Sequence, residues 1–201
     1  LFHGWGQLEL GEGHIKRAEA LFRRGTAAGR GSVSDIAFLW HSLGAVLTRQ
    51  RRHAEALAAF QSGLALHADS SQLLLGSAVA HANLANSLAA RRSFLAAVRA
   101  DPYHAQAWRA WGDHEARAGR GARARKLYLQ GLIRCRQHAP LWRAAARLER
   151  RDGNVARARA LLERGVAACD GAREVATDAR ATDRAQADVA QLLMSWAAIE
   201  M

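Results

Sequence analysis

Aromatic and small residues recur along the chain at a fixed interval of 34 residues. Phe60, Phe94 and Tyr128 follow one another at this interval, and so do Gly131 and Gly165. The sequence shows no long alternation of apolar and polar residues of the kind that marks strands, and it has only two Pro among abundant Ala, Leu and Arg. This pattern predicts an all-α protein built from tandem pairs of helices.

The period has small residues at two fixed positions, with an aromatic residue four places after the second. The fourth unit has Trp108, Gly112, Ala124, Tyr128 and Gly131 at the recurring positions, and the second has Trp40, Gly44, Ala56, Phe60 and Gly63. Small residues let the two helices of a pair approach closely, and aromatic residues fill the space toward the next pair. The arrangement resembles tetratricopeptide repeats, which implies a right-handed α-solenoid of helix-turn-helix units.

The period divides the chain into about five repeats and a partial sixth. We place the repeats roughly at 1–34, 35–70, 71–104, 105–138 and 139–170, an insertion at 169–188 and a partial repeat at 189–201. The insertion is polar and is expected to be either helical or disordered. Because both ends fall inside a repeat, we expect the chain to be part of a longer array.

Further recurring residues make the resemblance more specific than tetratricopeptide repeats in general. Trp111, Glu115, Gly119 and the string from Ala124 to Tyr128 resemble half-a-tetratricopeptide (HAT) repeats, and Glu149 with the following Gly-Asn-Val-Ala-Arg string repeats the pattern. HAT arrays occur in RNA-processing assemblies. The similarity is greatest to plastid factors that mature or stabilise mRNA. The resemblance therefore implies RNA processing, maturation or stabilisation as the function and the chloroplast as the location, with the nucleus as the alternative.

The charge supports an anionic partner. The chain carries 29 Lys and Arg against 18 Asp and Glu, a net charge of +11, and residues 103–166 alone hold 15 basic and 5 acidic residues. Residues four apart share one face of a helix, so the first helix of each repeat should present a basic stripe to the inner groove. We expect single-stranded RNA to bind there through phosphate neutralisation. The predicted nucleic-acid-binding residues are Arg109, Arg143, Arg147, Arg150, Arg151 and His41.

Two other interpretations of the stripe remain open. The groove could hold an acidic protein segment, which would make the chain a protein–protein interaction scaffold in a ribonucleoprotein or another assembly. The arginines could also form a solvated face without a ligand.

No enzymatic, metal or cofactor site is expected. The nine His include no pair with metal-ligand spacing, and Gly119-Arg120-Gly121 follows a predicted helix, so it does not fit a dinucleotide-binding loop. No apolar stretch reaches the ~18 to 20 residues of a membrane span, so we expect no membrane insertion.

An acidic residue recurs near the end of the first helix in several repeats. Because a partly buried carboxylate needs a donor, we predict a structural role for these residues, with Arg125 as the partner of Glu115 and Arg159 as the partner of Glu149.

Overall fold

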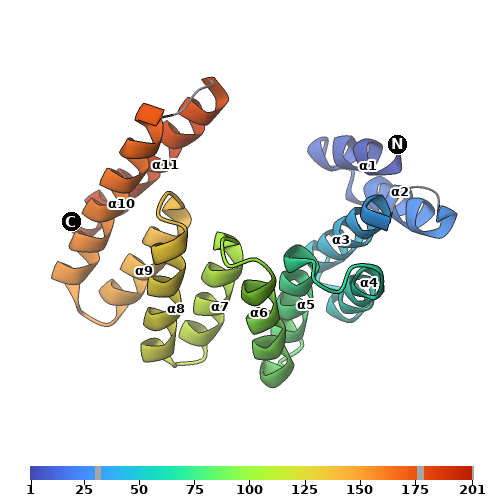
Figure 1. The fold of residues 1–201 in the computed structure, drawn as a ribbon, viewed down its shortest axis with the longest axis horizontal. Coiled ribbons are helices and arrows are strands. Elements are labelled where there is room, and N and C mark those ends of the chain that lie inside the picture. Colours follow the sequence, from blue (N-terminus) through green and yellow to red (C-terminus); the bar gives the residue numbers. More distant parts are fainter. Residues whose placement is uncertain (30–32, 176–178, 201) are drawn as a thin grey trace. The chain divides into compact units, whose positions relative to one another are not determined.

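The structure is a computed structural model that describes residues 1–29, 33–175 and 179–200, with side chains except at 33–35, 172–175, 179–182, 184–185 and 199–200. Its described part consists of helices and contains no strand, as the sequence predicts (Figure 1). The helices are α1 (Phe2–Gly11), α2 (Ile15–Ala28), α3 (Val33–Arg49), α4 (His53–Leu66), α5 (Ser71–Asn83), α6 (Ser87–Ala100), α7 (Ala105–Arg117), α8 (Gly121–Arg134), α9 (Ala139–Arg151), α10 (Val155–Val175) and α11 (Ala179–Glu200).

The chain forms two compact units, Leu1–Asp101 and Pro102–Met201. In the first unit α1 pairs with α2, α3 with α4 and α5 with α6. In the second α7 pairs with α8 and α9 with α10, and α11 packs on both α9 and α10. We call the first helix of each pair helix A and the second helix B. Successive A helices contact each other within each unit, as α7 does with α9. The predicted single array across 1–201 stays a prediction.

A glycine in helix B marks the point where three helices meet. A Cβ at Gly131 would lie 2.7 Å from Cβ of Trp108 on α7 and 2.8 Å from Cδ2 of Leu141 on α9. A Cβ at Gly63 would lie 3.0 Å from Cβ of Trp40 on α3 and 2.8 Å from Cδ2 of Leu73 on α5. These positions lack a side chain because two neighbouring A helices already fill the space, which explains why the position holds glycine in the second, fourth and fifth repeats and the small residue Ala97 in the third.

A second close approach joins the two helices within a pair. A Cβ at Gly44 of α3 would lie 2.5 Å from the ring of Phe60 on α4, a ring that is buried. In the α9–α10 pair the equivalent positions hold Ala146 and Leu162, both buried. The larger residue on helix A thus accompanies a smaller one on helix B, so the volume between the helices is conserved.

The acidic residue of helix A bonds to the residue five places later, which stands just before helix B. Glu115 accepts a hydrogen bond from Nε of Arg120 at 2.5 Å, and Glu149 accepts one from Nδ2 of Asn154 at 2.9 Å. Both carboxylates are buried. The structural role predicted for them agrees with this geometry, since each carboxylate ties the end of one helix to the start of the next.

The predicted donors for these carboxylates are wrong. Arg125 of α8 lies against the next repeat instead, where it donates to Glu149 at 2.7 Å and to Asp152 at 2.5 Å. The hydrogen bond to Glu149 raises the pKa of Arg125. Arg120 takes the carboxylate of Glu115, and Arg125 reaches the neighbouring A helix, so it joins two repeats.

In the first unit, the equivalent contact between two repeats has a carboxylate where the second unit has the guanidinium group of Arg125. Glu19 on α2 occupies the position of Arg125, and it accepts hydrogen bonds from Gln50 and Arg52 at 2.9 Å each. Gln50 occupies the position of Asp152 in the repeat. Burial would raise the pKa of Glu19, but the hydrogen bonds from its partners lower it below the ordinary value. The carboxylate is therefore ionised at neutral pH.

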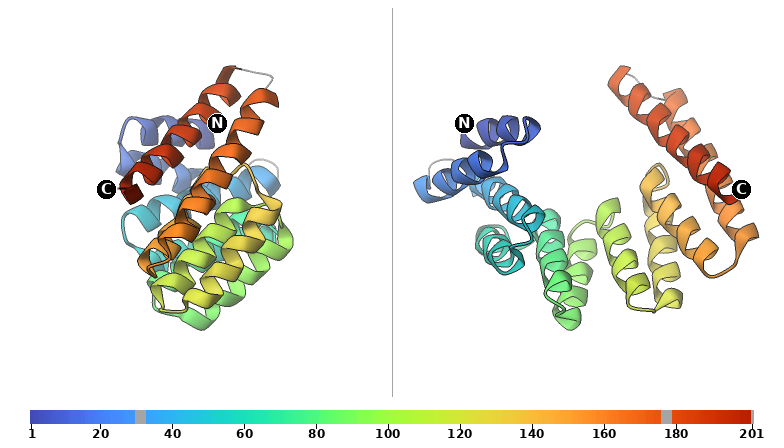
Figure 2. Two further views of the ribbon diagram at one scale, coloured as in Figure 1. Left: turned by 90° about the vertical axis from the view of Figure 1, so that its left-hand side faces the viewer. Right: turned by 180° about the vertical axis from the view of Figure 1, so that it is seen from behind.

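The last two helices are longer than the others and lie side by side (Figure 2). They extend into both ends of the predicted insertion, whose residues 176–178 lie outside the described residues. Leu192 of α11 is fully buried, and a Cβ at Gly165 would lie 3.3 Å from its Cδ2. Leu192 thus takes the place that Leu141 has in the preceding repeat, so α11 continues the register as a further helix A.

Gly131→Ala should lower the stability by about 1–3 kcal/mol, because the new methyl group overlaps side chains from two packed helices. Gly4→Ala is the control: Gly4 lies inside α1 with no atom near the added Cβ, so alanine should stabilise the helix by roughly 0.5–1 kcal/mol. Urea unfolding followed by circular dichroism measures both changes. Equal effects of the two substitutions would contradict the three-helix contact.

Glu149→Ala should destabilise the chain by about 1–3 kcal/mol, because Arg125 and Asn154 then lose a buried acceptor. Glu163→Ala serves as the matched control on an exposed face of α10 and should change the stability by less than about 0.5 kcal/mol. The melting temperatures of the two variants test this difference, and an unchanged value for Glu149→Ala would refute the structural role.

Candidate functional site

The strongest candidate for a ligand site is a hollow between α7 and α9 in the second unit, with a volume of about 620 Å³. We call it the arginine groove, since five of its lining residues are arginines. It is lined by Arg109, Asp113, Ala116 and Arg117 from α7, Tyr128 from α8, and Ala144, Arg147, Leu148, Arg150 and Arg151 from α9.

Helical spacing brings these side chains together. Arg109, Asp113 and Arg117 are four residues apart on α7, so they share one face of that helix. Arg147 and Arg151 have the same relation on α9. Because α7 and α9 are neighbouring A helices that contact each other, their two polar faces border one hollow.

One end of the groove is held by a fixed hydrogen-bonded group. The hydroxyl of Tyr128 donates to Oδ1 of Asp113 at 2.7 Å, and Nη1 of Arg109 donates to Oδ2 at 2.9 Å. Burial raises the pKa of Tyr128 above its usual range, and the hydrogen bond to Asp113 adds to this shift. The phenol therefore stays protonated as a donor, and Asp113 neutralises Arg109.

The remaining arginines of the groove differ in the hydrogen bonds and ion pairs that they form within the chain. Arg151 donates to Oδ1 of Asp152 at 3.4 Å and to the carbonyl of Ala116 at 3.2 Å, and Arg150 donates to the carbonyl of Ala198 at 3.2 Å. Arg117 and Arg147 are exposed, and neither forms a hydrogen bond or ion pair with the described part of the chain. These two guanidinium groups are available to an external anion.

A smaller hollow of about 190 Å³ lies on the other side of α9, facing α10 and α11. Arg147 and Arg150 border both hollows, and Arg143 borders the smaller one only. Arg143 donates to the side chain of Gln191 on α11. The polar side chain of α9 that points toward α11 is thus already hydrogen-bonded to that helix.

The structure brings most of the predicted site residues together. Arg109, Arg147, Arg150 and Arg151 line the arginine groove, and Arg143 lies beside it in the smaller hollow. His41 belongs to the first unit, where its ring lies 6.1 Å from the ring of Phe60. Binding of nucleic acid by these residues stays a prediction.

Sequence reasoning missed Arg117 and the role of Tyr128 in the groove. Arg117 could have been found, because it stands 34 residues before Arg151 and four residues after Asp113. Tyr128 recurs at an aromatic packing position, where only its hydroxyl distinguishes it from the phenylalanines of other repeats. That hydroxyl is the atom that orients Asp113.

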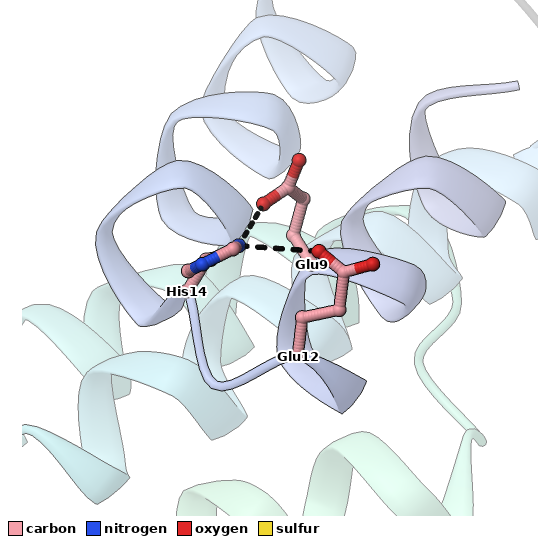
Figure 3. A group of neighbouring side chains, drawn as sticks. All are labelled: Glu9, Glu12 and His14. Atoms are coloured by element: carbon pink, nitrogen blue, oxygen red, sulfur yellow. Dashed lines mark hydrogen bonds and ion pairs between the residues drawn. The ribbon is translucent and has the colours of Figure 1, made fainter.

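Glu9, Glu12 and His14 gather at the turn between α1 and α2 and offer three atoms close enough to hold a cation (Figure 3). Nδ1 of His14 lies 2.9 Å from Oε2 of Glu9 and 3.3 Å from Oε2 of Glu12. The contact of Glu9 with the residue five places later is the same one that Glu115 and Glu149 make. The group is thus explained as the recurring tie between helix A and helix B.

None of the described helices is long and apolar enough to cross a lipid bilayer. Neither a family model nor a curated protein matches the sequence.

Solved structures are similar in fold at low sequence identity. A tetratricopeptide repeat protein from Parabacteroides merdae has a TM-score of 0.62 and 17% identity, covering 96% of this chain and 78% of its own. YrrB, described as a TPR protein with an unusual peptide-binding site, has a TM-score of 0.55 and 16% identity, with coverage of 92% and 90%. The APC/C hetero-tetramer Cut9–Hcn1 has a TM-score of 0.68 and 15% identity, covering 98% of this chain but 39% of that one. The chain therefore has an all-α helical repeat fold similar to that of tetratricopeptide proteins.

Proposed function

We propose that the chain is a non-enzymatic helical repeat scaffold that binds another protein in its arginine groove. The observation that carries this proposal is the pair of exposed guanidinium groups, Arg117 and Arg147, at a hollow between successive A helices. A groove of about 620 Å³ falls within the range of ligand sites in proteins. YrrB supports the proposal by analogy, since that protein of similar fold has a peptide-binding site.

The chemistry of the groove favours binding over catalysis. Its one carboxylate, Asp113, is bonded to Arg109 and Tyr128, so it is not poised as a general base. Tyr128 keeps its proton because burial raises its pKa. The groups that face the groove can therefore hold an anionic ligand but are not arranged to transfer a proton.

Single-stranded RNA is the second candidate ligand, favoured by the density of arginines on α9 and by the resemblance to HAT repeats. In that case the contacts would be Arg109, Arg143, Arg147, Arg150, Arg151 and His41, and guanidinium groups would neutralise successive phosphates. A role in RNA processing or mRNA stability and a chloroplast location belong to this candidate and stay predictions.

A photo-crosslinking amino acid at Ala116 distinguishes the two candidates. Ala116 lines the groove, whereas Ala122 is exposed at the start of α8 and serves as the control position. Irradiation of cells that produce the full chain should give a ribonuclease-resistant protein adduct from Ala116 and none from Ala122, identified by mass spectrometry. An adduct that ribonuclease removes, or no adduct from Ala116, would overturn the scaffold proposal.

A further inference from the structure

We propose that the arginine groove recognises an extended acidic segment of the partner protein, through carboxylate side chains that pair with Arg117, Arg147 and Arg150. This inference rests on the proposed function, because it names the chemistry of the segment that the scaffold would bind.

The groove has an excess of positive charge that the described residues of the chain do not neutralise. Asp113 pairs with Arg109 at 2.9 Å, and Asp152 lies against Arg151 at 3.4 Å. Arg117, Arg147 and Arg150 have no carboxylate partner in the part of the chain that the structure describes. Three neighbouring like charges repel one another, and anions of a ligand would relieve this repulsion.

Arginine suits carboxylates in particular. Its planar guanidinium presents N–H donors in a fork that matches the two oxygens of a carboxylate, so one Glu or Asp can accept two parallel hydrogen bonds. The guanidinium groups without a carboxylate partner among the described residues come from both walls of the groove, Arg117 from α7 and Arg147 with Arg150 from α9, and Arg150 also donates to the carbonyl of Ala198. A segment lying between the walls could place acidic side chains toward either side.

The floor of the groove leaves room for a polypeptide main chain. Ala116, Ala144 and Leu148 line the hollow together with the arginines, and Ala144 and Leu148 are buried, so these apolar side chains do not block it. An extended chain projects successive side chains to opposite sides. Acidic residues at alternate positions of the segment could therefore face the arginines of one wall or the other.

Asp113 favours a polypeptide over a nucleic acid as the occupant. Its carboxylate is partly exposed and uses one hydrogen bond on each oxygen, so lone pairs remain for a further donor. A main-chain N–H of a peptide can supply that donor, whereas the phosphate group of RNA has none and is repelled by the carboxylate; the donors of RNA lie on its riboses and bases instead. Arg143 and Arg150 also donate to α11, which interrupts a continuous ladder of free arginines along α9.

Fluorescence anisotropy tests the inference with the full chain and a labelled peptide in which glutamate alternates with serine. The double variant Arg117→Gln/Arg147→Gln should weaken binding about tenfold or more, because two charge-assisted interactions are lost. The control Arg123→Gln/Arg157→Gln removes the same charge from exposed positions of α8 and α10 outside the groove, and it should change the affinity less than about threefold. A peptide with glutamine in place of glutamate should not bind.

Three outcomes would overturn the inference. They are no binding of the glutamate peptide at low salt, equal losses in the two double variants, and displacement of the peptide by an oligouridine that binds more tightly. Circular dichroism spectra and melting temperatures of both variants establish that they are folded. If Ala116 still gives a protein adduct while the glutamate peptide fails to bind, the scaffold proposal stands and only the acidic chemistry of the segment is wrong.

Discussion

The close approach of three helices at one glycine of helix B is the constraint on which the repeat depends. At Gly131 the backbone of α8 lies against Trp108 from its own pair and Leu141 from the next, so this position sets the spacing within a pair and between pairs together. A side chain there would push both A helices outward. The groove between α7 and α9 is formed by these same two helices, and its width therefore depends on a residue that does not line it.

The sequence was sufficient to predict the helical repeats because the packing positions demand particular sizes. Small residues and aromatic residues recur at a fixed interval wherever backbones approach and rings fill the space, so their identities can be recognised in a single sequence. The polar ties were harder to predict. His14, Arg120 and Asn154 occupy one position and bond to the same kind of carboxylate, but they share no side-chain type. Any hydrogen-bond donor of suitable length satisfies that carboxylate, so the same residue type does not recur at this position.

The candidate site was predictable in part for the same reason. The arginines of α9 could be placed on the inner face from helical spacing, since backbone geometry fixes the direction of each side chain. Helical spacing could not predict which of these arginines already form a hydrogen bond or an ion pair with another part of the chain. Arg143 and Arg150 meet α11, whose register follows an insertion that breaks the period, and Arg109 is neutralised by a carboxylate one turn away. Such partners depend on tertiary placement and on the reach of long side chains.

The reversed polarity of the two inter-repeat joints means that the repeats are not interchangeable parts. Glu19 meets Gln50 and Arg52 in one joint, while Arg125 meets Glu149 and Asp152 in the other. If the second repeat were placed directly after the fourth, Arg125 would face Gln50 and the cation Arg52 and would find Leu47 where Glu149 stands. The junction at Arg125 therefore suits the fifth repeat and disfavours the second, so the charged contacts between repeats restrict which unit can follow another along the chain.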